Sequence, residues 1–63
     1  MENNISYDAL LTLKEATAYL KLSRSTLYKL MENGEIKGIK IGKVWRFQRK
    51  ELDNFIAKKA NNQ

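Results

Sequence analysis

Two helix-start signals lie close together in the first half of the chain, and they constrain the fold more than any other feature. Thr12 and Glu15 have the spacing of a capping box, in which the hydroxyl and the carboxylate each pair with a free backbone amide. Ser23 is a good N-cap for a second helix, and Gly34 is suited to end that helix in a left-handed turn. The sequence therefore predicts two short helices joined by a tight turn, over about residues 12–20 and 24–33.

Each predicted helix carries a single apolar stripe. The apolar residues repeat at helical spacing, and they are Leu13, Ala16 and Leu20 in the first helix and Leu27, Leu30 and Met31 in the second. Two short helices that each bury one stripe must cross at a steep angle and pack against a third element. This pattern predicts a helix-turn-helix.

Beyond Gly34 the apolar residues alternate with polar ones in the segments 39–41 and 45–47, and Gly42 lies between the two segments. Alternation with a period of two predicts a β-hairpin. A two-residue turn at Gly42 and Lys43 would mix charged and apolar side chains on both faces of this hairpin.

A three-residue loop over residues 42–44 separates the two kinds of side chain better, and we expect this loop. It would place two apolar pairs on the core side and one charged pair on the outer side, namely Ile41 with Trp45, Ile39 with Phe47, and Lys40 with Arg46. Val44 is a poor residue for a left-handed loop position, so a β-bulge could share the turn.

A third helix is predicted from Lys50 to about Lys59, with Leu52, Phe55 and Ile56 as its apolar stripe. The order is then helix, helix, strand, strand, helix, a mainly α fold with a small β-hairpin that forms a winged helix-turn-helix. Sixty-three residues provide one domain. We expect a flexible lead-in, the folded domain and a frayed tail, over residues 1–10, 11–59 and 60–63.

The chain contains neither cysteine nor histidine, so disulfides, thiolate metal sites and histidine ligands cannot stabilise it. Without these side chains, and without room for a deep pocket, the chain is not expected to be an enzyme or to hold a metal or cofactor. No apolar run approaches the roughly 20 residues that span a bilayer, and the N-terminus lacks the blocks of a secretory signal. We therefore expect a cytoplasmic protein that makes no membrane contact.

Positive charge is concentrated in the middle of the chain. Between Lys21 and Lys50 there are nine basic residues and two acidic ones, while the whole chain has a net charge of +5. This distribution indicates one basic surface that meets a polyanion. A solvated lysine surface is the simpler alternative.

The second predicted helix carries most of the candidate binding residues. Short hydroxyls and long cations lie at its N-terminal end and opposite its apolar stripe, a mixture typical of a helix that enters the major groove of DNA. The candidates are Ser23, Arg24, Ser25, Thr26, Tyr28 and Lys29. Capping alone would explain Ser23, a helix start would explain Thr26, and the ring of Tyr28 could instead pack on the hairpin. A small core would not select Arg24 or Lys29.

The predicted hairpin adds Lys40, Lys43 and Arg46 to the candidates. A basic hairpin beside a helix-turn-helix is a wing, which can lie along an adjacent backbone or minor groove of DNA. The alternative is a charged edge strand that only prevents aggregation. Trp45 is expected in the core, with stacking on a base as the alternative.

The run from Leu11 to Ile56 resembles the excisionase family of DNA-binding domains, which are related to the winged helix-turn-helix heads of MerR-type regulators. The segments that carry the resemblance are LTLKEATAYL, SRSTLYKLMENGEI and IKIGKVWRF. The resemblance implies that the chain binds DNA through the helix beginning at Ser23 and through the wing around Gly42. Such domains serve as recombination directionality factors of mobile elements, as small transcriptional regulators, or as modules of larger proteins. No dimerisation helix or effector domain follows Phe55, so no small-molecule effector is expected.

We therefore expect a protein of bacterial, phage or mobile-element origin that binds double-stranded DNA in recombination or in transcription regulation. A domain of this size buries little surface, so effective binding is expected to need neighbouring copies or a partner such as an integrase. The alternative is a protein-interaction adaptor that uses Tyr28 and Val44 on a protein partner. A continuous basic face joining the second helix and the wing would favour DNA, and an apolar patch there would favour a protein.

Overall fold

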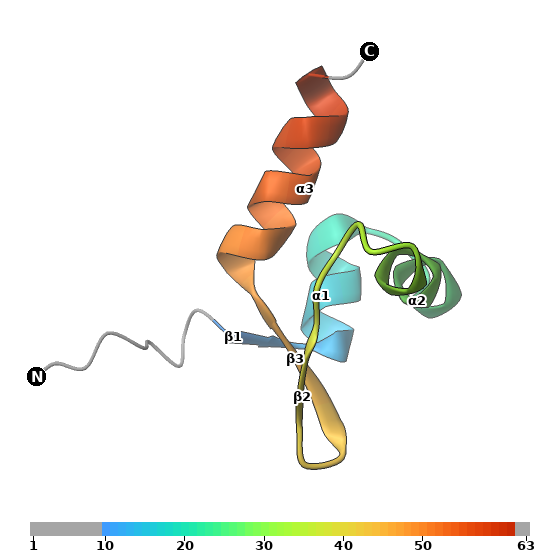
Figure 1. Ribbon diagram of the computed structural model, residues 1–63, viewed down its shortest axis with the longest axis vertical. Helices are drawn as coiled ribbons and strands as arrows, with labels where there is room; N and C mark the ends of the chain where they lie inside the picture. Colours follow the sequence, from blue (N-terminus) through green and yellow to red (C-terminus); the bar gives the residue numbers. More distant parts are fainter. Residues whose placement is uncertain (1–9, 62–63) are drawn as a thin grey trace, which may run out of the picture.

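The computed structural model describes residues 10–61, which form three helices and a three-stranded sheet. The elements are β1 (Leu10–Thr12), α1 (Leu13–Leu20), α2 (Arg24–Glu32), β2 (Ile39–Ile41), β3 (Val44–Gln48) and α3 (Arg49–Asn61). Figure 1 shows α1 and α2 on one side, the β2–β3 hairpin projecting at the lower end, and α3 rising from β3. This is a winged helix-turn-helix, and the predicted fold class is confirmed.

Two differences from the predicted boundaries concern the ends of the described part. Leu10 belongs to strand β1, which was not predicted, while residues 1–9 of the predicted lead-in lie outside the described residues. Helix α3 continues to Asn61, beyond its predicted end near Lys59. Residues 62–63 of the predicted tail also lie outside the described part.

The helix-turn-helix is built on the predicted caps. Thr12 Oγ1 accepts a hydrogen bond from the backbone N–H of Glu15 at 3.0 Å, and the Glu15 carboxylate accepts one from the N–H of Thr12 at 2.9 Å. Lys21 ends α1 in a left-handed conformation, with a φ of 56°, and thereby turns the chain toward α2. Ser23 caps α2, since its Oγ accepts from the N–H of Thr26 at 3.2 Å. Both helix starts are therefore as predicted.

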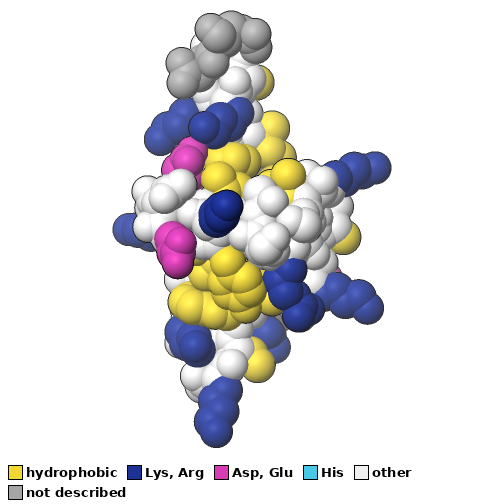
Figure 2. Space-filling model, turned by 90° about the vertical axis from the view of Figure 1, so that its right-hand side faces the viewer, with side chains coloured by type: hydrophobic (Ala, Val, Ile, Leu, Met, Phe, Trp, Pro, Cys, Tyr) yellow, Lys and Arg dark blue, Asp and Glu magenta, His cyan; other side chains and the backbone are white. Residues whose placement is uncertain are grey.

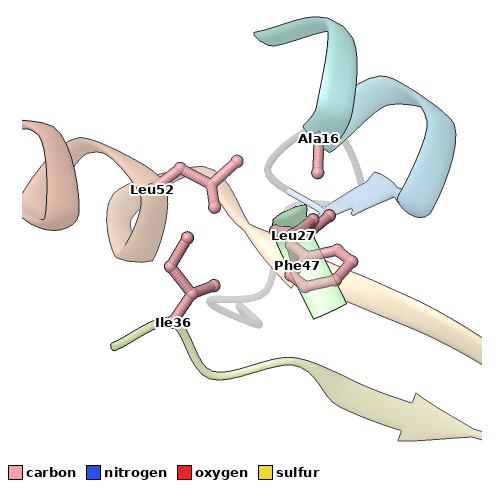
Figure 3. Close-up of a cluster of buried hydrophobic side chains, with 5 residues drawn as sticks. All are labelled: Ala16, Leu27, Ile36, Phe47 and Leu52. Atoms are coloured by element: carbon pink, nitrogen blue, oxygen red, sulfur yellow. The ribbon is translucent and has the colours of Figure 1, made fainter. Parts of the chain in front are cut away.

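The core is small, and each of its members comes from a different part of the chain (Figure 3). Its fully buried side chains are Ala16 of α1, Leu27 of α2, Ile36 of the segment before β2, Phe47 of β3 and Leu52 of α3. The stripes predicted for α1 and α2 are confirmed, because their remaining leucines are half-buried against this cluster. Outside the hairpin, two details differ from the prediction: Ile36 joins the core, and Ile56 of α3 is exposed.

The hairpin closes with a two-residue turn, so the predicted three-residue loop is wrong. Gly42 takes the first turn position with a φ of 66°, Lys43 follows it, and Val44 opens strand β3. The resulting antiparallel pairs are Ile39 with Arg46, Lys40 with Trp45, and Ile41 with Val44. Glycine adopts this positive φ without strain, and a β-branched residue such as Val44 is better suited to a strand than to a loop.

The physical reason for this register is strand β1, which is too short to show a pattern in the sequence. The sheet order is β1-β3-β2, and Leu11 of β1 pairs with Phe47 of the central strand. Both side chains face the core, and neighbouring residues of a strand point to opposite faces. Ile39 pairs with the neighbour of Phe47, so Ile39 and Ile41 lie on the sheet face away from the core.

The segment between α2 and β2 is fastened to α3. The backbone N–H of Lys37 donates to the Glu51 carboxylate at 3.2 Å, and Glu35 forms an ion pair with Lys59 at 2.9 Å. Ile36, between these two anchors, is fully buried. The start of the wing is therefore fixed relative to the core.

Tyr19 links α1 to α3, because its phenol donates a hydrogen bond to the carboxylate of Asp53. This hydrogen bond, with smaller contributions from desolvation and the charge of Asp53, raises the pKa of Tyr19 above its usual value of 10.0. The phenol stays protonated below the pKa of the unfolded chain, so the link is complete there and is lost as the pH rises through the raised folded-state pKa.

Gly38 lies where the backbone passes close to the core, and its replacement by alanine is expected to be destabilising. An added Cβ would lie 2.8 Å from Trp45 Cε3 and 3.0 Å from both Met31 Cε and Phe47 Cε2. Two of these atoms belong to rigid rings, so Gly38→Ala should lower the free energy of unfolding by about 1–3 kcal/mol. Thermal unfolding followed by circular dichroism measures this effect, and an unchanged melting temperature would show that the rings move aside.

Candidate nucleic-acid interface

The N-terminal end of α2 carries a cluster of hydroxyl groups. Ser23 Oγ donates to Thr26 Oγ1 at 2.9 Å, in addition to accepting from the N–H of Thr26, and it lies 3.3 Å from Ser25 Oγ. The hydroxyl of Ser23 is therefore occupied by the cap. Thr26 accepts within the cluster and keeps its own hydrogen for an outside acceptor. Of the three predicted hydroxyls, those of Ser25 and Thr26 are better placed to meet a partner.

The exposed side of α2 carries the predicted long side chains. Arg24, Tyr28 and Lys29 are all exposed, whereas Leu27 between them is fully buried. Arg24 is also the first residue of α2, where the partial positive charge of the helix end attracts anions. The helical periodicity thus divides this helix into a core side and a solvent side.

The wing presents its three predicted cations in different directions. Lys43 lies in the turn, and Lys40 points over the ring of half-buried Trp45, with 4.9 Å between Nζ and the ring centroid. Arg46 is half-buried, and its Nη1 donates to the carbonyl oxygen of Trp45 at 3.1 Å. The expectation that Lys40 and Arg46 share the outer face is wrong, because the two-residue turn places them on opposite faces of the hairpin.

A hollow of about 290 Å³ joins the start of α1, the exposed side of α2 and the wing. It is lined by Thr12, Leu13, Lys14, Tyr28, Lys43, Val44, Trp45 and Arg46. The structure thus brings the predicted residues Tyr28, Lys43 and Arg46 together around one concave surface. Ser23, Arg24, Ser25, Thr26, Lys29 and Lys40 do not line this hollow.

Lys14 is the member of this hollow that sequence reasoning missed. It lies in the first turn of α1, where the helix dipole disfavours a cation. That unfavourable position was the only sign in the sequence that Lys14 could have a functional role. With Lys43 and Arg46, Lys14 places three cations around the hollow, and none of its lining residues is acidic.

A larger hollow of about 530 Å³ lies on another side, between the turn of the helix-turn-helix and α3. Apolar and aromatic side chains such as Leu30, Phe55 and Ile56 line most of it, and its charged members are Lys21 and Lys59. Lys59 is already paired with Glu35. This hollow has fewer cations than the one beside the wing and holds none of the predicted wing cations.

Figure 2 shows the face that carries α2. Lys and Arg side chains surround a hydrophobic area below the centre of this face, and others project at the lower end, where the hairpin lies. Acidic side chains are visible on the left of this view, one group of them beside the hydrophobic area. The chain has no acidic residue from Ile36 to Lys50, so none of them belongs to the wing. The face therefore combines an apolar area with basic side chains at its centre, on its right and at its lower end.

A helix-turn-helix followed by a basic wing defines a winged helix-turn-helix protein. Residues 10–60 match the model of a family described as a helix-turn-helix domain, and the chain belongs to that family. The predicted membership in the excisionase family of helix-turn-helix DNA-binding domains is confirmed.

Curated relatives carry related descriptions. The chain is 39% identical over 49 residues to a "Probable excisionase" of Saccharopolyspora erythraea, an alignment that covers 78% of this chain and 50% of the relative. It is 32% identical over 47 residues to a "Putative DNA-binding protein" of Mycobacterium tuberculosis, which covers 75% of this chain and 60% of the relative. The chain thus spans 50% to 60% of the length of these relatives. No solved structure matches the chain.

Two further observations concern residues 10–61. None of their helices has the length and apolar character needed to cross a bilayer. Within the same range, no three His, Cys, Asp or Glu side chains converge in a way that could hold a metal ion.

Proposed function

We propose that this chain binds double-stranded DNA as an excisionase-type protein, with α2 in the major groove and the wing on the adjacent backbone or minor groove. The observation that carries the proposal is the hollow between α2 and the wing, which gathers Lys14, Lys43 and Arg46 and has no acidic residue in its lining. A concave surface bordered by cations suits the ridge of a phosphate backbone. The proposal includes no catalytic step.

The residues divide into two roles. Lys14, Lys29, Lys43 and Arg46 neutralise phosphates and fix the orientation of the domain, together with Lys40. Arg24, Ser25 and Thr26 lie at the end of α2 that leads into the groove, where short side chains let the backbone approach base edges. Tyr28 is exposed beside the hollow and is suited to donate its phenol hydrogen to a phosphate. Ser23 supports these contacts as the cap of α2.

The small size of the domain limits how tightly a single copy can bind DNA. A single module of this kind buries a small area of DNA, so one copy binds weakly, and affinity is gained through adjacent copies or through a recombinase bound nearby. The description of the Saccharopolyspora erythraea relative supports a role as a recombination directionality factor. Transcription regulation uses the same surface. An excision assay with a cognate integrase distinguishes the two roles, since only a directionality factor increases excision.

Titration of a labelled random-sequence duplex in rising salt tests the DNA-binding proposal. If five cations each neutralise one phosphate, affinity should fall by roughly 10²–10³-fold between about 50 and 200 mM monovalent salt. Fluorescence anisotropy measures this dependence. An affinity that does not change with salt, or no binding at low salt, would contradict the proposal.

One observation favours the alternative function, a protein-interaction adaptor. Val44 and Tyr28 are both exposed, and Val44 is accompanied by exposed Ile39 and Ile41. Contiguous exposed apolar side chains are typical of protein contact surfaces. The same salt titration decides between the functions, because an adaptor would leave the duplex unbound.

A further inference from the structure

The hollow of about 530 Å³ beside α3 lies outside the proposed DNA surface except at Thr26, and we call it the α3 hollow. On α2, Thr26 and Leu30 line this hollow, whereas Tyr28 lines the smaller hollow beside the wing. Residues 26 and 30 are one helical turn apart, and residue 28 points to the other side of the helix. The two hollows therefore lie on opposite flanks of α2. A duplex bound to the proposed surface would leave the floor of the α3 hollow uncovered.

The floor of the α3 hollow is apolar and comes from all three helices. Leu20 of α1, Leu30 of α2 and Phe55 of α3 line it, and all three are half-buried against the core. At its margin Tyr19 is 42% exposed and Ile56 is 43% exposed. The phenol of Tyr19 already donates to a carboxylate of α3, so its ring is the part that remains for contact. An open apolar recess of this kind indicates a surface that a partner covers.

Two cations border the α3 hollow, and none of its lining residues is acidic. Lys59 forms the ion pair with Glu35 at 2.9 Å, and its ammonium also lies 5.7 Å from the ring centroid of Phe55. Lys21, in the turn of the helix-turn-helix, forms no ion pair within residues 10–61. The charge of Lys59 is thus partly compensated, and that of Lys21 is available to a partner.

The backbone of Lys21 adds an independent observation. Its φ of 56° is a left-handed conformation that glycine usually supplies at the end of a helix. Two hydrogen bonds to the last turn of α1 fix this conformation, because the N–H groups of Lys21 and Leu22 donate to carbonyl oxygens at 3.3 and 3.0 Å. A lysine in a position that suits glycine indicates that its side chain has a role beyond the turn.

These features narrow the choice of partner. An apolar recess bordered by cations is complementary to a surface that is apolar in the middle and acidic at its margins. A DNA backbone could meet Lys21 but would not cover Leu30 and Phe55. A second copy of this chain would bring the same two lysines to the contact. The hollow lies between α2 and α3, and a groove between two helices is suited to a third helix.

We propose that the α3 hollow is a docking site for an acidic amphipathic helix of a partner protein. Apolar side chains on one face of that helix cover Leu30, Phe55 and Ile56, and carboxylates at its margin reach Lys21. This site goes beyond DNA binding. In combination with the proposed function, it lets one copy of the chain hold a duplex and a protein at the same time.

The test uses two designed helical peptides of equal length as probes. Both carry leucines at the i, i+3, i+4 and i+7 spacing, and the other positions are glutamates in one peptide and lysines in the other. Anisotropy of the labelled peptides is followed as the full chain is added. The glutamate peptide is expected to bind, and the lysine peptide to bind roughly tenfold more weakly or not at all. In NMR spectra of the labelled chain, the glutamate peptide should shift the methyl signals of Leu20, Leu30 and Ile56.

Three variants locate the contact. Ile56→Ala should bind the glutamate peptide roughly tenfold more weakly, with unchanged DNA affinity. Lys21→Gly should bind it roughly threefold to fivefold more weakly, and its melting temperature should rise by roughly 2–5 °C because glycine suits the left-handed turn. Lys58→Ala is the matched control, since it removes an exposed cation of α3 that lines a different hollow. It should leave peptide binding unchanged.

The outcomes distinguish the docking site from the proposed function. The docking site is overturned if neither peptide binds, if both bind equally, or if Ile56→Ala has no effect. It is also overturned if the wild-type chain self-associates in sedimentation and Ile56→Ala abolishes this, because a second copy would then cover the hollow. A chain that binds the glutamate peptide but no duplex retains the docking site and loses the proposed function. If a saturating duplex displaces the peptide, simultaneous binding of DNA and protein is overturned.

Discussion

Replacing Phe47 by alanine is expected to destabilise the domain by about 3–5 kcal/mol and to leave most molecules unfolded. Phe47 is a large fully buried side chain on the central strand of the sheet, and it packs with the four other core residues (Figure 3). A domain of this size has a total stability of only about 3–5 kcal/mol to lose. Urea denaturation, followed by circular dichroism and by the fluorescence of Trp45, the single tryptophan, measures the change.

The matched control is Ile56→Ala, which removes an exposed aliphatic side chain from α3. Its expected effect is below about 1 kcal/mol, because little buried surface is lost. If Phe47→Ala were no more harmful than this control, the cluster around Phe47 would not be what stabilises the fold.

Removing the two cations on the exposed side of α2 is expected to weaken DNA binding strongly. Lys29→Ala should lower the slope of log affinity against log salt concentration by about one, whereas Arg24→Ala should lower affinity with a smaller change of slope; together they should lower affinity about 10–100-fold at moderate salt. Both residues are exposed and lie outside the core, so the variants should fold normally. Anisotropy titration of a labelled duplex at several salt concentrations measures both quantities.

Lys58→Ala is the control for a simple loss of charge, since it removes one exposed cation from α3. It should change the slope by much less than one. Equal effects of Lys58→Ala and Lys29→Ala would mean that binding depends on net charge alone, and α2 would then not be the contact surface.

The helices of this chain could be predicted because their signals are local. The capping box at Thr12, the cap at Ser23 and the glycine after α2 each act within one turn of helix, and all three are present in the structure. The stripes that include Ala16 and Leu27 follow from the same periodicity.

The hairpin register could not be predicted because a distant segment decides it. Strand β1 is only three residues long, yet its pairing with β3 determines which face of the hairpin meets the core. Judged alone, the hairpin looked better with its isoleucines inside. The structure buries Phe47 as predicted but exposes Ile39 and Ile41, and Lys40 lies on the other face with its ammonium over the ring of Trp45.

Only part of the candidate site could be predicted from the sequence. The charge distribution indicated the basic middle of the chain, and periodicity separated Arg24 and Lys29 from the core. Lys14 and the hollow beside the wing were missed, because three elements far apart in the sequence converge there. A concave surface arises from tertiary packing, so it cannot be predicted from the periodicity of any one segment.

The segment that joins α2 to the wing has a consequence for the choice of DNA site. Ile36 is buried in the core, and its neighbours are tied to α3 through Glu51 and Lys59, so the start of the wing is held against the core. If the domain binds DNA as proposed, the number of base pairs between its major-groove and minor-groove contacts is set before DNA arrives. Such preorganisation limits the conformational entropy that the protein loses on binding. Any change of shape needed for the fit must then come from the duplex. A domain with such a fixed spacing is expected to select sequences that deform easily there.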